Sequence, residues 1–294
     1  MTFQKKLFAL LILLLSFQLK AQITINNTIY TPNQLINGVL VPPMSGVTIS
    51  NVAYRGVYGD NSKYQVGYFS TATTTLSQMG FANGIVLTTG KTSDIPAPLG
   101  TPTTPPPLMD EFYADCTPGL VQQDGTCSTF VNDLAVLADA QGYYNATILE
   151  FDFVTVHTSV TFRYVFGSEE YNNGVDSNYQ CTEFNDKFGF LISGPGISGG
   201  QGFSNDARNM AILPNGSQVS INSVNDGVIG PDGDSSACLL SNPNWVQNVV
   251  SPEFSGRIDG THLNGNTQIL TASQSNLTPG QTYHIKLIIT DVSD

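Results

Sequence analysis

The stretch "LEFDFVTVHTSVTFRYVF", from Leu149 to Phe166, decides the fold class of this chain. Apolar and polar residues alternate in both halves, and the short polar segment "HTS" separates the halves. Successive side chains of a β-strand point to opposite faces, so a period of two gives each half one apolar face. The stretch therefore predicts two strands joined as an antiparallel hairpin with one face buried.

Short strands of the same kind are expected along the rest of the chain, separated by Gly and Pro residues. They start at residues 47 ("VTISNVAY"), 65 ("QVGYFS"), 84 ("GIVLTTG"), 187 ("KFGFLIS"), 209 ("NMAILP"), 218 ("QVSINSV"), 267 ("TQIL") and 282 ("TYHIKLIIT"). A helical period occurs once, over residues 128–140, with a shorter capped turn over 31–40. We expect a mostly β fold: an antiparallel two-sheet sandwich or jelly roll with about one helix and long loops.

The first 21 residues have the features of a secretory signal peptide. Lys5 and Lys6 precede an apolar run, and the small residue Ala21 ends the segment. An uncleaved N-terminal anchor is the alternative. Residues 22–294 then form one exported β-domain. No later segment reaches the ~18 consecutive apolar residues of a membrane span, so we expect no transmembrane segment in the mature chain.

The chain is acidic, with a formal net charge of −12. Removal of the predicted signal peptide also removes three lysines, which leaves 8 basic and 23 acidic residues and a net charge of −15. Nucleic-acid binding needs basic patches that meet the phosphates, so this charge argues against a nucleic-acid partner. It is typical of a secreted or cell-surface protein.

Four cysteines follow the signal peptide, and an even number in an exported chain indicates two disulfides. Three pairings are possible. We favour Cys116–Cys127, which closes a short loop, and Cys181–Cys238, which closes a long one. A zinc site is the rival interpretation, but the spacing contains no C-x-x-C and the chain has only three His.

The adjacent carboxylates Glu169 and Glu170 follow the fold-deciding stretch and raise the question of catalysis. Neighbouring strand residues face opposite ways, so the two cannot flank one glycosidic bond together. A hydrolase would need one of them with Asp152 or Asp186. No nucleophile elbow or zinc-protease motif is present either. We expect no catalytic residues, and instead a β-corner where one glutamate accepts backbone N–H groups or pairs with Arg163.

Calcium is the one cofactor that the sequence suggests. Hard oxygen ligands are dense in the acidic loop "DGVIGPDGD" and near residue 186, although the loop is no EF-hand. The corner glutamates could add a further ligand. The candidate ligands are Glu169, Glu170, Asp186, Asp226, Asp232 and Asp234. A plain solvated acidic loop is the alternative.

Exposed aromatic side chains are a second kind of candidate site, since they can stack on sugars. Trp245 is the only Trp of the chain, and Tyr179 lies near the predicted corner. Both are candidate contacts for an extracellular glycan or surface polymer. Trp245 is equally expected as a core residue.

The ordered motifs "GYFS", "GIVLTTG", "ATILEFDFV", "YVFGSEEYNN" and "NMAILPNGSQVSINSVNDG" resemble the choice-of-anchor L domain. The resemblance covers nearly the whole mature chain. It implies a secreted or surface-displayed bacterial β-domain of the Bacteroidota type, in proteins that often end in a type IX secretion sorting domain. Relatives continue past the final "DVSD" with a further strand, so a downstream anchor or sorting domain is expected beyond this chain. The family has no established catalytic residues.

These observations predict a non-enzymatic module of a secreted or cell-surface bacterial protein that serves adhesion or glycan and matrix binding. Two alternatives remain. The first is an extracellular polysaccharide hydrolase built on the carboxylates above. The second is a structural spacer, which predicts a flat surface without a pocket or an aromatic platform.

Overall fold

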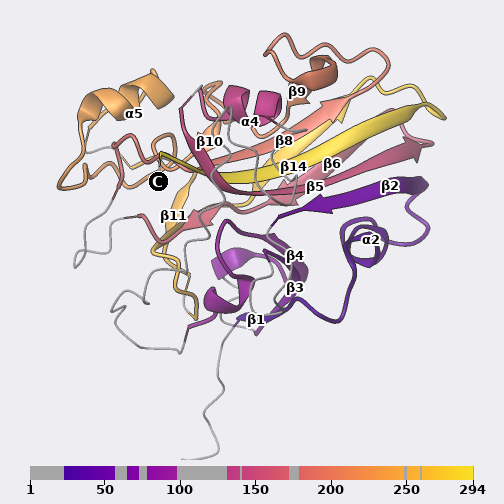
Figure 1. Ribbon diagram of the computed structural model, residues 1–294, viewed down its shortest axis with the longest axis horizontal. Helices are drawn as coiled ribbons and strands as arrows, with labels where there is room; N and C mark the ends of the chain where they lie inside the picture. The colour runs from indigo at the N-terminus through magenta and orange to yellow at the C-terminus, as the bar shows by residue number, and fades with distance from the viewer. Residues whose placement is uncertain are drawn as a thin grey trace, which may run out of the picture.

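The computed structural model describes residues 23–56, 65–72, 78–97, 131–139, 141–171, 179–247, 250–258 and 260–293. The fold is mostly β, with antiparallel sheets stacked as a sandwich (Figure 1). The strands are β1 (Ile23–Asn26), β2 (Val47–Arg55), β3 (Val66–Thr71), β4 (Asn83–Leu87), β5 (Tyr143–Thr155), β6 (Ser159–Tyr164), β7 (Gly167–Ser168), β8 (Lys187–Ser193), β9 (Arg208–Asn209), β10 (Val219–Ser220), β11 (Phe254–Gly256), β12 (Gly265–Thr267), β13 (Leu270–Ser275) and β14 (Thr282–Val292). The helical elements are α2 (Pro32–Gln34), the π-helical turn η1 (Leu35–Leu40), η3 (Thr92–Asp94), α4 (Val131–Leu137), η4 (Ser204–Asp206) and α5 (Ser235–Ser241).

The largest sheet has the strand order β10-β8-β14-β5-β2, with β9 paired to β8. Its two longest strands lie side by side at the centre, so that Ile285 faces Phe151 and Leu287 faces Leu149 across the ladder. These four side chains are buried in the largest core cluster. The period of two in both strands therefore predicted the buried face of this sheet correctly.

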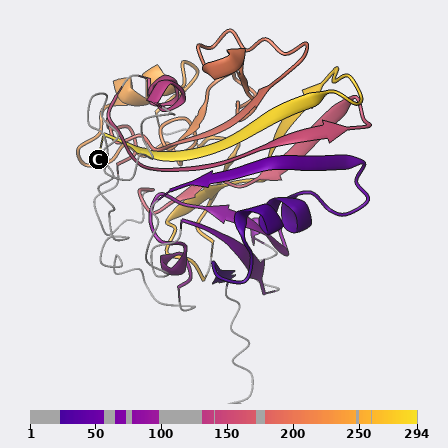
Figure 2. The same cartoon turned by 45° about the vertical axis from the view of Figure 1, so that its right-hand side comes forward.

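Smaller sheets form the layer on the other side of this core, as Figure 2 shows. Strands β6 and β13 form one pair, β11-β12-β7 form a short sheet, and β1-β3-β4 form another. The ring centroids of Phe162 on β6 and Phe190 on β8 are 4.8 Å apart, and those of Tyr164 and Phe188 are 5.0 Å apart. Strand β6 thus packs face to face on the main sheet, which is the predicted sandwich arrangement.

The predicted hairpin between the two halves of the fold-deciding stretch is wrong. Strand β5 is flanked by β14 and β2, and β6 pairs with β13 in the other layer. The connection of residues 156–158 therefore crosses from one layer to the next. Alternation specifies which face of a strand is buried, and two such faces can meet across a core as well as lie side by side.

The outer face of the main sheet is covered at one end by helix α4 and by the segment around η4. Leu134, Leu137 and Ala138 pack there against Ile148 of β5 and Ile288 of β14. This is the apolar face expected for the helix at 128–140, although its first three residues lie outside the described part. With cover on both sides, β8 is buried at almost every position.

Two further helical segments have local causes. The turn expected at 31–40 forms as α2 and η1, where Thr31 and Gln34 make a capping box. Helix α5 was not predicted, because its sequence lacks an amphipathic period. Asp234 caps this helix by accepting the Ser236 N–H at 2.7 Å. In the described part of the chain, no helix has the length and apolarity needed to cross a bilayer.

Candidate functional site

The segment that contains Glu169 and Glu170 forms a corner next to strand β7. The Ser168 hydroxyl accepts the Glu170 backbone N–H at 3.0 Å, and the Asn264 side-chain amide donates to the Glu169 carbonyl. Tyr171 is buried, with its ring edge-on to Phe254 at a centroid distance of 5.1 Å. The segment therefore forms a corner, but these hydrogen bonds engage backbone groups of the two glutamates and not the carboxylates, for which the sequence predicted the role.

The two glutamates of the corner have different surroundings. Glu169 is half-buried and lines a cavity, and burial raises the pKa of its carboxyl. Glu170 is buried. Burial, together with the negative charges of Glu170, Asp186 and Asp226, raises the pKa of the Tyr171 hydroxyl well above its ordinary value. Glu169 therefore lines the cavity and Glu170 is absent from its described lining; both follow the end of β7 at Ser168 and do not lie within a strand.

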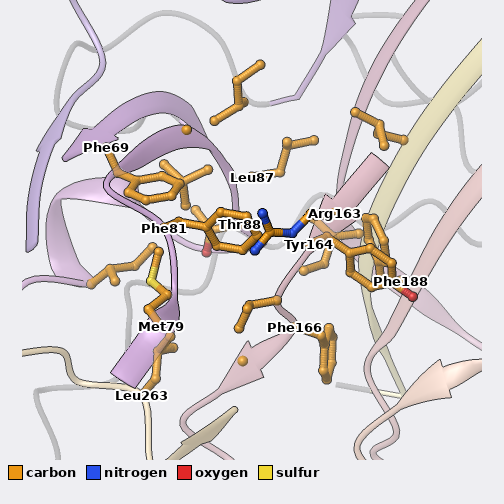
Figure 3. Close-up of a pocket in the computed structure, with 18 of the residues that line it drawn as sticks. Phe69, Met79, Phe81, Leu87, Thr88, Arg163, Tyr164, Phe166, Phe188 and Leu263 are labelled. Carbon is orange, nitrogen blue, oxygen red and sulfur yellow. The ribbon is translucent and has the colours of Figure 1, made fainter. Parts of the chain in front are cut away.

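The cavity beside the corner has a volume of about 430 Å³ and lies where the small sheet β1-β3-β4 meets β6, β7 and the main sheet. Most of its walls are apolar, including Phe69, Met79, Phe81, Leu87, Phe166, Phe188 and Leu263 (Figure 3). The charged residues in the described lining are Arg163, Glu169 and Asp186. The sequence did not predict this cavity, because its walls come from strands that are far apart in the chain.

Arg163 is the cation of the cavity wall. Its guanidinium carbon lies 5.0 Å from the centroid of the Phe81 ring, which is cation–π geometry. Figure 3 shows the guanidinium above this ring among the cavity side chains. The residue is exposed, so the charged group stays in contact with water while the cavity extends into the protein.

The outward face of β6 and β13 is a regular array of hydroxyl groups, which we call the hydroxyl ladder. The register pairs Ser159 with Ser275 and Thr161 with Ser273. The next pair along the two strands joins Thr271 to Arg163. These side chains are all exposed, while the alternate residues of both strands face the core. The ladder therefore ends at the cation that lines the cavity.

The predicted disulfide between Cys181 and Cys238 is confirmed, with Cα atoms 4.8 Å apart. Trp245 packs against it and is only 7% exposed. Its indole N–H donates to the Asn225 side chain at 3.3 Å. Trp245 is therefore a core residue and does not offer a stacking face to a sugar. The pair Cys116–Cys127 lies outside the described residues.

Tyr179 was the second candidate for an aromatic contact. It is half-buried, and its ring lies edge-on to Phe184 at a centroid distance of 5.2 Å. An aromatic platform for sugar stacking therefore finds no support at either predicted residue.

The carboxylates predicted to bind calcium mostly make local hydrogen bonds. Asp226 accepts the Gln180 amide at 2.7 Å and the Val228 N–H at 3.0 Å. Asp186 accepts the Val292 N–H at 3.3 Å, Asp234 caps α5, and Asp232 is exposed. Within the described ranges, no three His, Cys, Asp or Glu residues gather as a metal-binding group. A calcium site remains a prediction from the composition of the acidic loop.

The comparisons with known proteins connect this structure to one family. The family model of the choice-of-anchor L domain matches residues 24–294, nearly the whole chain. The chain belongs to the choice-of-anchor L domain family. This family is a non-catalytic module of surface proteins and implies an extracellular or surface location. No curated protein and no solved structure gave a significant match.

A charged network on the outer face of the main sheet is a further feature of this choice-of-anchor L domain. His284 contacts Asp152 at 2.7 Å and Glu150 at 3.4 Å. Lys286 contacts Asp133 of α4 at 2.6 Å and Glu150 at 3.8 Å. The register places His284 opposite Asp152 and Lys286 opposite Glu150, so two alternating patterns read together could have predicted these pairs.

The network shifts the pKa values of its members. The hydrogen bond to Glu150 raises the pKa of His284; burial opposes this shift and the hydrogen bond to Asp152 reinforces it. Burial disfavours the charged form of Glu150, yet His284, Lys286 and Arg55 together hold its pKa below the ordinary value. Asp152 is thus part of an ion-pair network on the face opposite the cavity. It is not placed to act with the corner glutamates in hydrolysis.

Proposed function

We propose that this choice-of-anchor L domain is a non-catalytic binding module of an exported surface protein, and that it contacts a neutral extracellular glycan or matrix polymer. The hydroxyl ladder is the observation that supports this proposal. Serine and threonine hydroxyls both donate and accept hydrogen bonds, as the hydroxyls of a sugar do. Residues two apart on a strand are separated by ~6.6–6.8 Å, and neighbouring strands lie ~4.8 Å apart. The ladder therefore offers a repeating set of partners to an extended polymer.

The charge of the chain argues for a neutral polymer. At a net charge of −15 after removal of the predicted signal peptide, the protein repels polyanions such as nucleic acids or strongly acidic polysaccharides. Export through the predicted signal peptide at residues 1–21, followed by display through a downstream anchor, would bring the ladder to the cell exterior. These two steps are part of the proposal.

The alternatives explain less of the structure. A spacer needs neither a cavity nor an ordered polar face. Among the described residues, a hydrolase retains only Glu169 and Asp186 as a carboxylate pair on one cavity, and the walls there are mostly apolar. Sugars need polar partners for their hydroxyls, so these walls do not suit a scissile glycan. Measurement of reducing ends released from polysaccharides by the purified domain tests the hydrolase; release that is lost in Glu169→Gln would support it.

The binding proposal is tested with residues 22–294 on a glycan array and by co-sedimentation with insoluble polysaccharides, with and without calcium chloride. Ser273→Glu places a bulky anion in the ladder and should weaken binding at least tenfold. Thr48→Glu is the matched control, because Thr48 is exposed on strand β2, away from the ladder. Equal binding by both variants, or binding of no polymer in either condition, would refute the proposal.

A further inference from the structure

We infer that the cavity is a binding site for an acyl chain with an anionic head group, with the chain between the sheets and the carboxylate or phosphate of the head against Arg163. This inference does not depend on the glycan proposal, because it rests on the apolar cavity and on the charge of Arg163 and not on the hydroxyl groups of the ladder. The volume of the cavity, about 430 Å³, lies within the ~300–1,000 Å³ usual for small-molecule sites.

The walls of the cavity determine the chemistry of the ligand body. They are formed mainly by aliphatic and aromatic side chains, among them Phe69 and Leu87 of the β1-β3-β4 sheet, Phe188 of the main sheet, and Met79. A sugar or a nucleotide placed there would leave many polar groups without partners, at a cost of ~1–3 kcal/mol for each unsatisfied group. A hydrocarbon chain has no hydrogen bonds to give up on leaving water, and burial of its apolar surface against these walls is favourable.

The head of the ligand is determined by Arg163. One face of its planar guanidinium lies on the Phe81 ring. The N–H donors lie in the plane of the guanidinium, so contact between its face and the ring does not use them. In the described part of the chain, no ion pair or hydrogen bond engages these donors. A guanidinium binds a carboxylate through two parallel hydrogen bonds, and the low polarity of the adjacent walls strengthens them. The exposed position of Arg163 puts this contact at the mouth of the cavity.

The two acidic residues of the lining do not prevent the binding of an anion. Burial raises the pKa of Glu169, which favours the neutral acid, and Asp186 accepts a backbone N–H from Val292. Tyr164 is neutral as well, since burial raises the pKa of its hydroxyl. Arg163 is thus the cationic partner that the described lining offers to an anion.

Two sources can supply this chemistry: a free fatty acid and the acyl chain of an anionic membrane lipid. The experiment uses residues 22–294 with two probes, dodecanoate in isothermal titration calorimetry and phosphatidylglycerol vesicles in co-flotation. Dodecan-1-ol has the same chain without the charge, and butanoate has the charge without the chain. We expect dodecanoate to bind more tightly than either control.

Variants locate the site. Arg163→Met keeps the apolar length of the side chain and removes the charge, so dodecanoate affinity should fall about tenfold to a hundredfold, while dodecan-1-ol affinity stays within about twofold. Arg208→Met is the matched control, because Arg208 is exposed on β9 and the substitution removes one positive charge elsewhere. Leu87→Trp fills the cavity and should reduce the binding of both dodecyl probes. Thermal unfolding confirms that each variant is folded.

The outcomes separate the sources and decide the inference. Dodecanoate binding that depends on Arg163 and Leu87 supports a free fatty acid, and vesicle binding with the same dependence supports a membrane lipid. Binding of either probe that is equal in Arg163→Met and Arg208→Met would overturn the inference. The absence of any binding to both probes would overturn it too. Neither result affects the glycan test, because Ser273 does not line the cavity.

Discussion

The disulfide between Cys181 and Cys238 should contribute a large increment to the stability of this domain. The two residues are 57 positions apart, so the bond closes a long loop in the unfolded chain. In the chain-entropy model, a loop of this length corresponds to about 4 kcal/mol at 25 °C. The double variant Cys181→Ala/Cys238→Ala should therefore lose about 3–4 kcal/mol of its free energy of unfolding.

The only tryptophan of the chain makes this measurement direct. Trp245 packs against the disulfide, so its fluorescence reports both unfolding and loss of the sulfur contact. Guanidinium chloride titration of the wild type and the double variant gives the two free energies by linear extrapolation. The control is Cys116→Ala/Cys127→Ala, which removes the other predicted disulfide. With a loop of about a dozen residues, the model gives about 3 kcal/mol for that bond.

Two results would refute this reasoning. A loss below about 1 kcal/mol in Cys181→Ala/Cys238→Ala would mean that the loop is already restrained in the unfolded state. A larger loss in the control than in the test variant would show that loop length does not set the order of the two effects. The first result also requires an unchanged slope of the unfolding transition, since a changed slope reports a different unfolded state.

Further predictions concern packing and charge. Gly265→Ala should cost about 1–3 kcal/mol in thermal unfolding, because a Cβ at this position would lie 2.7 Å from atoms of two aromatic rings; an unchanged melting temperature would contradict the packing. Lys286→Met should cost about 3–5 kcal/mol in urea unfolding, since it leaves the carboxylate of Asp133, which is 2% exposed, without its cation; Lys286→Arg is the control and should retain most of the stability. The pKa of His284 is higher in the folded state than in the unfolded state, so protonated His284 stabilises the fold. This contribution is complete below the unfolded-state pKa of about 6.5 and is lost as pH rises through the folded-state pKa. A His284→Gln variant should abolish this pH dependence of stability, and an NMR titration that gives His284 a pKa at or below 6.5 would contradict the prediction.

The sequence predicted which face of each strand is buried, but it did not predict which strands pair with one another. Leu149, Phe151 and Phe153 face the core as their alternation requires. Their partner strand β14 lies more than 120 residues later, and nothing in a local pattern specifies that distance. The hairpin expected between β5 and β6 failed for this reason. Side-by-side pairing and packing across a core bury the same residues, so the choice depends on competition among all the strands.

In the candidate site, too, features set by residues close in sequence were predicted, and, apart from the disulfide, contacts between segments far apart in the chain were not. The corner at Glu169 and the bond between Cys181 and Cys238 follow from strand geometry and loop length, and both were predicted. Pairing with Arg163 was one of the two arrangements expected for a corner glutamate, whereas the structure places Arg163 over Phe81. A residue on an exposed strand face contacts whatever element covers that face, and the covering element comes from a separate sheet. Helix α5 was missed because a cap and a disulfide hold it, and neither produces a period of 3.6.

Arg163 belongs to both proposed sites, and its substitution should affect their two ligands differently. It lies opposite Thr271 at the end of the hydroxyl ladder, and its guanidinium lines the cavity. Loss of its charge should therefore weaken a carboxylate strongly and a neutral glycan only slightly, because the glycan is held by several hydroxyls. A substitution at Ser273 should have the opposite effect. If both ligands respond equally to both substitutions, ladder and cavity act as one surface, and a single amphipathic polymer would then replace the two separate ligands.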